Sequence, residues 1–206
     1  MATAPPGAQP PHMLGSPTAT VTMEEFADFQ CGGCAATHPV LKEVNSAYAG
    51  NKNFKFIYRN FPLQMHDKAT EASLAAEAAG LQSESKFWQM QDQLFTNQHV
   101  WAASSNYLGL FAEYAQKIGL DVEKFKADMS GMITRSRVDQ DLARGRGIGI
   151  SSTPSVIING KLVPPNEVTV AGLKRIIDAE IQAAAPPPQP PPTNSTSSSN
   201  SSPANK

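Results

Sequence analysis

The chain has 206 residues, with 17 Lys and Arg against 18 Asp and Glu, and a formal net charge of −1. A balance this close to neutral, without a long run of one sign, argues against a surface that binds nucleic acid or anionic membranes. No apolar run reaches the roughly 18 residues needed to span a membrane, and the first residues lack the charged-then-apolar pattern of a secretory signal. The protein is therefore expected to be either cytosolic or a form from which a signal or anchor has been removed.

Both ends of the chain lack the periodic apolar residues of a helix or strand. Residues 1–17 are rich in proline, and residues 186–206 are a low-complexity tail of Pro, Ser and Asn. Such segments cannot bury enough apolar surface to offset the entropy lost on ordering. We therefore predict that both ends are disordered and that the globular part lies between them.

A strand, a helix and a second strand are predicted in the first third of the chain. Residues 20–29, TVTMEEFADF, alternate apolar and polar side chains before reaching a phenylalanine pair, as a strand entering the core does. Residues 35–50 carry apolar side chains at helical spacing and end at a glycine. Residues 53–61, NFKFIYRNF, alternate again. The predicted order is strand, helix, strand.

The middle of the chain shows helical periodicity throughout. Its segments are alanine-rich or amphipathic, and several open at a Ser or Asp cap or stop at a glycine. The predicted helical segments are residues 68–81, 83–98, 106–120 and 121–147. This part is therefore predicted to be an all-helical insert covering residues 67–147.

Four arginines form the densest basic cluster, near the end of the insert. They alternate with two acids, in the order Arg135, Arg137, Asp139, Asp141, Arg144 and Arg146. Mixed charge of this kind is typical of a solvated helix face. We therefore expect these side chains to lie in solvent.

Strand signals return after the insert. Residues 153–163, TPSVIINGKLV, join two apolar runs through an Asn-Gly pair, which is a strong hairpin signal. Residues 168–185 then repeat apolar side chains at helical spacing. Together with the first third, these elements predict a mixed α/β sheet covered by helices, built from residues 18–66 and 148–185.

The only two cysteines, Cys31 and Cys34, flank Gly32 and Gly33 where the first strand gives way to the helix. A zinc site needs about four ligands, usually from two paired clusters, and no second cluster accompanies this one. A structural disulfide would close a very small loop and add little stability. The pattern therefore favours a redox-active pair over zinc ligands, a structural disulfide or two buried free thiols.

The position of the predicted helix distinguishes the two cysteines chemically. Cys31 lies just before the helix N-terminus, where free backbone N–H groups and the helix dipole favour a thiolate. Cys34 lies one turn inside and is expected to keep a higher pKa. We therefore predict that Cys31 is the nucleophile and leaving group, and that Cys34 resolves the mixed disulfide.

Several separated motifs in this chain occur in an order that resembles the thioredoxin superfamily. They are the strand before CGGC, a helix with Pro39 after it, and a later STPSVIINGK. The long helical insert and the segments KFWQMQDQLFTNQ, YAQKIGLDVEKF and GISSTPSVIINGK resemble the DsbA-like branch in particular. The match covers about residues 14–182. It implies an α/β, thioredoxin-like fold with an inserted all-helical domain.

The resemblance also implies roles for residues around the cysteines. Thr153-Pro154 matches the family's cis-proline loop, in which Thr153 would pair with the substrate chain and Pro154 would keep the loop open. Gly32 and Gly33 are expected to line the same substrate-binding site, offering backbone N–H groups without side-chain charge. The substrate-binding set is therefore these four residues.

Glu25, six positions before Cys31, matches the family's buried acid beneath the active site. The resemblance makes it a candidate proton relay for Cys34. The alternative is that Glu24 points inward and Glu25 lies on the surface, because a slip of one residue moves a side chain to the other face of a strand. We interpret His38 as a helix histidine satisfied within the protein, and assign His66 no role.

The function implied by the resemblance is thiol-disulfide exchange. DsbA carries a histidine at the place of Gly33 that helps to stabilise the thiolate, so its absence here leaves the direction of electron flow open. We expect a monomeric, extracytoplasmic enzyme that introduces disulfides into cysteine-containing proteins and is reoxidised by a quinone-linked membrane partner of the DsbB or VKOR type. No metal and no cofactor beyond the Cys31–Cys34 disulfide is expected, and no nucleic acid partner. The alternatives are a reductase or isomerase on the same scaffold, and a non-catalytic, chaperone-like binding module.

Overall fold

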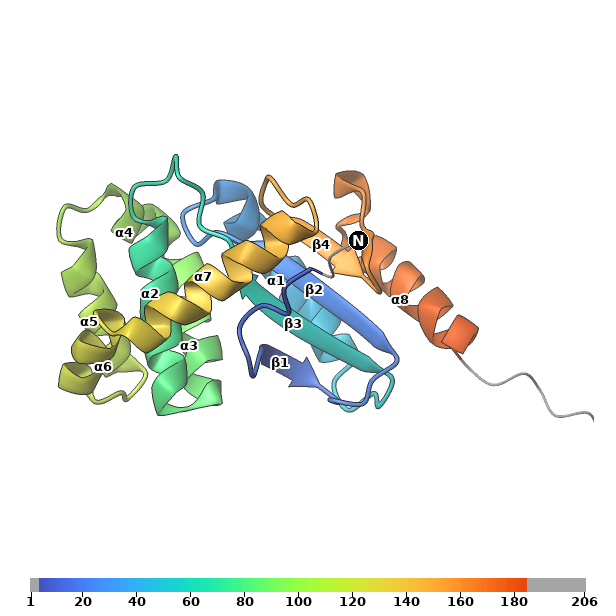
Figure 1. Cartoon of the computed structure of the whole chain (residues 1–206), viewed down its shortest axis with the longest axis horizontal. Helices are drawn as coiled ribbons and strands as arrows, with labels where there is room; N and C mark the ends of the chain where they lie inside the picture. The colour runs from blue at the N-terminus through green and yellow to red at the C-terminus, as the bar shows by residue number, and fades with distance from the viewer. Residues whose placement is uncertain (1–3, 185–206) are drawn as a thin grey trace, which may run out of the picture.

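The structure is a computed structural model that describes residues 4–184. At its centre is a five-stranded sheet with strand order β1-β3-β2-β4-β5 (Figure 1). The strands are β1 (His12–Gly15), β2 (Val21–Ala27), β3 (Phe54–Asn60), β4 (Ser155–Ile158) and β5 (Lys161–Leu162). β2 and β3 are parallel, and each of the other neighbouring pairs is antiparallel. The predicted mixed α/β sheet is thus confirmed.

The helices form two groups in space. Helices α2 to α6 pack together at one end of the sheet, and α7 runs from that group back across one face of the sheet, while α1 and α8 belong to the sheet-containing part (Figure 1). The helices are α1 (Gly32–Ala47), α2 (Ala69–Gln82), α3 (Glu84–Thr96), α4 (Gln98–Ala103), α5 (Tyr107–Lys117), α6 (Val122–Met129), α7 (Met132–Gly147) and α8 (Val170–Ala184). A single turn of 3-10 helix, Pro165–Glu167, precedes α8. Among the described residues no helix is both long enough and apolar enough to cross a membrane.

Successive side chains of β2 and β3 point to opposite faces of the sheet, and the two faces pack against different helices. The face toward α1 carries the main core, in which Met23, Phe56 and Tyr58 pack with Leu41 and Val44 of the helix. The face toward α7 carries a smaller apolar cluster, consisting of Phe26, Phe61, Ile150 and Ile157. Each of the two long central strands is therefore buried on both sides.

Gly145 allows α7 to lie directly on the sheet. A Cβ atom at this position would be 2.5 Å from Phe61, closer than real Cβ contacts come, and 3.0 Å from Phe26, which is unusually tight. The chain therefore leaves α7 next to the small apolar cluster, which Ile150 joins. It then enters the sheet as β4, which pairs with β2.

The predicted disorder of residues 1–17 is wrong for the part that the structure describes. β1 pairs with β3 along its whole length, with His12 opposite Tyr58. The residues before β1 are held through their backbone carbonyls, which accept hydrogen bonds from Arg59, Arg137 and Arg144. Those carbonyls belong to Pro5, Pro6, Ala8, Gln9 and Pro10. The predicted disorder of residues 186–206 lies outside the described residues.

The prediction of a solvated arginine face holds for only half of the cluster. Arg135 and Arg146 are exposed, but Arg137 forms an ion pair with the buried Glu77 of α2. Arg144 reaches the sheet, where its Nε lies 2.7 Å from a carboxylate oxygen of Glu24. Arginines two positions apart on α7 point to different sides of the helix, so one of each pair faces solvent and the other binds a buried acid.

A buried ion network joins the α7-facing side of the sheet to α7. The Arg59 side chain is 3% exposed and contacts Glu24 at 2.7 Å and Asp141 at 2.9 Å. Asp141 also accepts hydrogen bonds from the backbone N–H groups of Ala8 and Asn60. Glu24 is shared between Arg59 and Arg144, whose hydrogen bonds hold its pKa below the ordinary value against the opposing effect of burial. The network therefore fixes β2, β3, α7 and the N-terminal segment to one another.

Candidate active site

The CGGC motif lies where β2 ends and α1 begins. Cys31 is the N-cap residue of α1, and its N–H donates to the carbonyl of Asp28 at 3.1 Å. The predicted placement of Cys31 just before a helix N-terminus is thus confirmed. Cys31 is half-buried and Cys34 is fully buried, and both are free thiols in this structure.

The surroundings of Cys31 favour its thiolate. The hydrogen bond from the Cys34 thiol is the largest influence, and the backbone N–H groups of Cys34 and Gly33 act in the same direction. Together they lower the pKa of Cys31 from 9.0 to about 5, although partial burial opposes them. Hydrogen bonds to a charged group stabilise that charge. At neutral pH Cys31 is therefore a thiolate.

Cys34 has the opposite character. Its hydrogen bond to Cys31, its burial and the nearby carboxyl of Glu25 all raise the pKa of its thiol far above the ordinary value. The Asp28 N–H points at its sulfur, with a nitrogen–sulfur distance of 3.5 Å. The reduced pair thus holds one proton, on the inner sulfur, which is the arrangement needed for an outer nucleophile and an inner resolving thiol.

The pH dependence of alkylation tests this arrangement. Only the thiolate reacts with iodoacetamide, so the modification of Cys31 should rise through a midpoint near its pKa of about 5 and not near 9.0. Mass spectrometry of the alkylated peptide distinguishes Cys31 from Cys34, which should stay unmodified in the folded protein because it is buried. A midpoint above pH 8 would contradict the geometry described.

The Thr153–Pro154 loop faces the CGGC motif. The peptide bond between these two residues is cis, as the resemblance implied, and the carbonyl oxygen of Thr153 is 3.4 Å from the Cys31 sulfur. A Cβ atom on Gly33 would be 3.2 Å from Pro154 and 3.7 Å from that sulfur, whereas one on Gly32 would meet nothing within 4 Å. The five residues predicted to act on substrates at the motif and the loop therefore do lie together.

Glu25 lies beneath the motif on the α1-facing side of β2. It is 2% exposed, it pairs in register with Tyr58 of β3, and among the described residues its Oε1 has no hydrogen-bond partner. Burial without such a partner raises the pKa of its carboxyl from 4.5 to about 8. The alternative of an exposed Glu25 is wrong, because Glu24 and Glu25 are both buried, on opposite faces of the sheet.

Replacing Glu25 by glutamine should make the reduced protein more stable at alkaline pH. Glu25 ionises at 4.5 when unfolded and at about 8 when folded, so folding takes up a proton between these values and the free energy of unfolding falls as pH rises through them. At about 1.4 kcal/mol per pKa unit, the full cost above pH 8 is about 5 kcal/mol. Urea unfolding at pH 5 and pH 9 measures the difference. Glu25→Gln should gain several kcal/mol only at pH 9, and equal effects at both pH values would contradict the assignment.

Asp28 is a buried acid that the sequence did not suggest. Its carboxylate accepts hydrogen bonds from the N–H groups of Gln30 at 2.7 Å and Leu63 at 2.8 Å, and lies 2.7 Å from Nδ1 of His66. It thereby joins the turn before Cys31 to the segment after β3, and gives His66 a structural partner. The bond to the N–H two residues ahead is the local turn that aspartate favours, but no sequence signal marks the contacts from Leu63 and His66.

Gln98 is a second residue of the site that the sequence did not suggest. It is the first residue of α4, and its Nε2 donates to the carbonyl oxygens of Phe29 at 2.6 Å and Cys31 at 2.9 Å. The helical group therefore holds the loop that carries the nucleophile. A single glutamine in a polar stretch gives no sign of this role. Within the described residues, no three His, Cys, Asp or Glu side chains gather where they could hold a metal ion.

Comparison with known proteins shows the family of the chain. A family model described as Thioredoxin matches residues 8–179. The chain is 30% identical over 174 residues to a probable disulfide bond formation protein D of Bacillus anthracis, a match that covers 82% of this chain and 77% of that protein. It is also 32% identical over 153 residues to the Na(+)/H(+) antiporter NhaA 1 of Mycolicibacterium gilvum. That match covers 73% of this chain but only 23% of the antiporter, so the chain spans less than a quarter of the length of that relative.

Solved structures show the same fold. The crystal structure of oxidised BdbD from Bacillus subtilis superimposes with a TM-score of 0.74 at 22% identity, covering 88% of this chain and 98% of that one. The crystal structure of alpha-DsbA1 from Wolbachia pipientis superimposes with a TM-score of 0.71 at 20% identity, covering 85% and 93% of the two chains. The chain therefore has the fold of these DsbA-type structures and belongs to the thioredoxin family.

Proposed function

We propose that this protein oxidises pairs of cysteines in other proteins to disulfides, through its own Cys31–Cys34 pair. The observation that carries the proposal is the place of Cys31 at the N-terminus of α1, where the Cys34 thiol and the backbone N–H groups of Cys34 and Gly33 stabilise its thiolate. A thiolate of low pKa stabilises the reduced form of the pair, so the oxidised form gains driving force to accept electrons, as in strongly oxidising members of this chemistry. The kinship with a disulfide bond formation protein D supports the same direction.

The reaction proceeds in two exchanges that start from the oxidised pair. A substrate thiolate attacks the sulfur of Cys31, the bond between Cys31 and Cys34 breaks, and Cys34 leaves as a thiolate that takes up a proton. A second substrate thiolate then attacks the substrate sulfur of the mixed disulfide and expels Cys31 as a thiolate. Two electrons pass to the enzyme, and the substrate gains one disulfide.

Glu25 is the proposed proton donor for the first exchange. With a pKa of about 8 it is protonated at neutral pH. It lies near enough to Cys34 that its ionised carboxylate raises the pKa of that thiol. A departing Cys34 thiolate, which is buried and strongly basic, would take a proton from such a group. No metal or organic cofactor enters these steps.

Substrate binding is assigned to the surface around the outer sulfur. The substrate segment beside its cysteine would pair with the backbone of Thr153, while Pro154 stands opposite Gly33. The absence of side chains at Gly32 and Gly33 leaves backbone N–H groups next to Cys31 and room for varied neighbours. This arrangement suits protein substrates that share only a cysteine.

The reduced enzyme must pass its two electrons onward. We propose that it works outside the cytosol, where disulfides persist, and that a quinone-linked membrane protein of the DsbB or VKOR type reoxidises it. A reductase on the same scaffold would need the reverse flow, from a donor that keeps Cys31 and Cys34 reduced.

Oxidative refolding tests the proposal against its alternatives. The oxidised protein is mixed in slight excess with a reduced, unfolded ribonuclease, and the recovery of disulfides and of ribonuclease activity is followed. Recovery within minutes, with matching appearance of reduced Cys31 and Cys34, is expected. Catalysis of insulin reduction by dithiothreitol without any oxidative refolding would indicate a reductase, and suppression of aggregation with no thiol exchange would indicate a binding module. Either result would overturn the proposal.

A further inference from the structure

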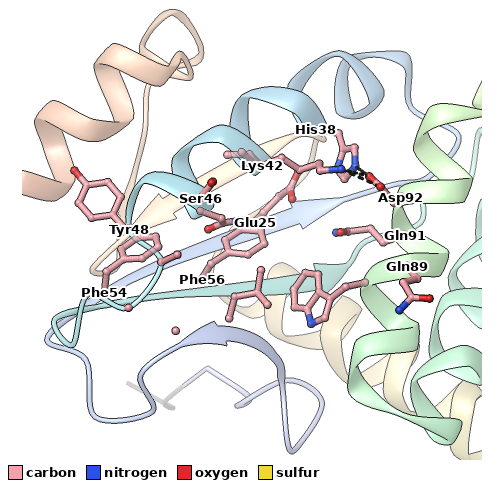
Figure 2. A pocket seen from close by; sticks show the side chains of 17 residues that line it. Glu25, His38, Lys42, Ser46, Tyr48, Phe54, Phe56, Gln89, Gln91 and Asp92 are labelled. Atoms are coloured by element: carbon pink, nitrogen blue, oxygen red, sulfur yellow. Dashed lines mark hydrogen bonds and ion pairs between the residues drawn. The ribbon is translucent and has the colours of Figure 1, made fainter.

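A cavity of about 560 Å³ lies between α1, α3 and the α1-facing side of the sheet (Figure 2). Its walls include four aromatic side chains, Tyr48 from the end of α1, Phe54 and Phe56 from β3, and Trp88 from α3, together with polar side chains from α1 and α3. Neither cysteine lines it, and neither does Thr153 or Pro154. The cavity is therefore separate from the surface on which protein substrates are proposed to bind.

Glu25 forms the polar floor of this cavity. Figure 2 shows its carboxyl among the aromatic side chains, between β3 and α1. Among the described residues, no group donates to its Oε1, and the same is true of the buried Oδ1 of Asn45 on α1. Buried oxygens that lack a donor are costly, and most such atoms in proteins are satisfied. The cavity thus presents two acceptors that call for a hydrogen-bond donor.

The size and lining of the cavity suit a small organic molecule better than water alone. A water molecule occupies about 30 Å³ in the liquid, so many waters would be needed to fill the space, and those against the aromatic side chains would lack polar partners on that side. Small-molecule sites usually measure about 300–1,000 Å³, with mostly apolar walls and a few placed polar groups. The cavity beside Glu25 has this composition.

The charges at the rim favour a neutral occupant. Nζ of Lys42 lies 2.7 Å from one oxygen of Asp92 and 2.9 Å from the other, and Nε2 of His38 lies 2.8 Å from the same carboxylate. The charge of Lys42 and the ring of His38, both on α1, are therefore already paired with the carboxylate of Asp92 on α3. An ionic ligand would have to break this arrangement, whereas a neutral one would not.

We propose that the cavity binds a neutral, amphipathic small molecule whose apolar body packs between Tyr48, Phe56 and Trp88 and whose hydroxyl group donates to Glu25. This site goes beyond the proposed exchange chemistry at Cys31 and Cys34, because neither cysteine lines the cavity. The ligand class is defined by one donor and an aromatic or aliphatic body that fits the cavity.

A matched pair of probes tests the site. 4-Propylphenol carries the required hydroxyl, and 4-propylanisole has nearly the same shape without a donor. Titration of the full-length reduced protein is followed by the NMR signals of the Trp88 indole N–H and the Asn45 side-chain amide. Saturable binding of the phenol, at least about tenfold tighter than that of the anisole, is expected, because a site that hydrogen-bonds a hydroxyl rejects an analogue lacking it.

Variants on α1 locate the binding. Asn45→Phe places a ring in the cavity and should weaken phenol binding at least about tenfold. Glu43→Phe is the control, because Glu43 is exposed on the same helix and does not line the cavity. If Asn45→Phe does not fold, Ser46→Phe replaces it, since Ser46 is exposed but does line the cavity. Equal binding of the two probes, non-saturable shifts, or unchanged binding by the filled variants would each show a cavity that holds water only, and would overturn the proposal.

Discussion

Cys31→Ser is expected to lose thiol-disulfide exchange completely, a decrease of at least about a thousandfold, whereas Cys34→Ser is expected to accumulate mixed disulfides. Cys31 is the only one of the two sulfurs that reaches the surface, and it is the one whose thiolate is stabilised. When it attacks a disulfide in a target protein, the inner thiol is expected to resolve the intermediate. Serine at position 34 removes that second step and leaves the first intact.

The two variants act as controls for each other. Each is reduced, mixed with a disulfide-containing protein, quenched with acid and separated on a non-reducing gel. Cys34→Ser should give a band at the summed mass that disappears with dithiothreitol, and Cys31→Ser should give none. Equal trapping by both variants would contradict the assignment of an outer nucleophile and an inner resolving thiol.

Arg59→Met is expected to lower stability by about 3–5 kcal/mol, the usual cost of removing one partner from a buried ion pair. It would leave the buried Asp141 without its 2.9 Å ion pair, and would free the carbonyls of Pro6 and Ala8 from their guanidinium donor. Methionine fills much of the same volume, so the effect comes mainly from charge. For a domain of this size the melting temperature should fall on the order of 10 °C.

The control for Arg59→Met is Lys126→Met. Lys126 pairs with Glu123 at 2.9 Å, but both side chains are more than half exposed. Exposed pairs contribute about 0–1 kcal/mol, so this variant should unfold close to the wild type. Urea unfolding of the reduced proteins gives both free energies. Similar losses for the two variants would show that the network between β3 and α7 is not a main source of stability.

The parts of the site that could be predicted depend on neighbours in sequence. Apolar and polar residues alternate along β2 and then change to helical spacing in α1, so the sequence alone predicts where the strand ends and the helix begins. This places Cys31 at the helix start and Cys34 one turn inside. Local patterns suffice for these two positions because both elements are continuous there. The alternation along β2 left Glu24 and Glu25 as alternatives, and the family resemblance chose Glu25; both side chains are buried, on opposite faces of the sheet.

The parts that could not be predicted depend on contacts across the chain. The N-terminal segment is held at Pro5 and Pro6 by arginines more than 50 residues away, so its composition alone gave the wrong expectation. Arg137 and Arg144 turn inward because Glu77 and Glu24 lie beneath α7. Charge alternation along one helix cannot show which side chains will meet buried acids on other elements.

The contacts that hold the active-site loop are of the same kind. Asp28 is fixed by His66, 38 residues away, and the carbonyl of Cys31 is fixed by Gln98, 67 residues away. Both partners are polar residues outside any motif. The proposed chemistry of the pair rests on four consecutive residues, whereas the groups that position the pair come from distant parts of the chain.

The reduction potential of the Cys31–Cys34 pair, measured by equilibrium with glutathione at neutral pH, tests the central claim most directly. Each pKa unit by which the Cys31 thiolate is favoured is worth about 1.4 kcal/mol, or about 30 mV for this two-electron couple. A potential more oxidising than about −200 mV, approaching the about −120 mV of DsbA, is predicted. A value near the about −270 mV of thioredoxin would contradict the oxidising role.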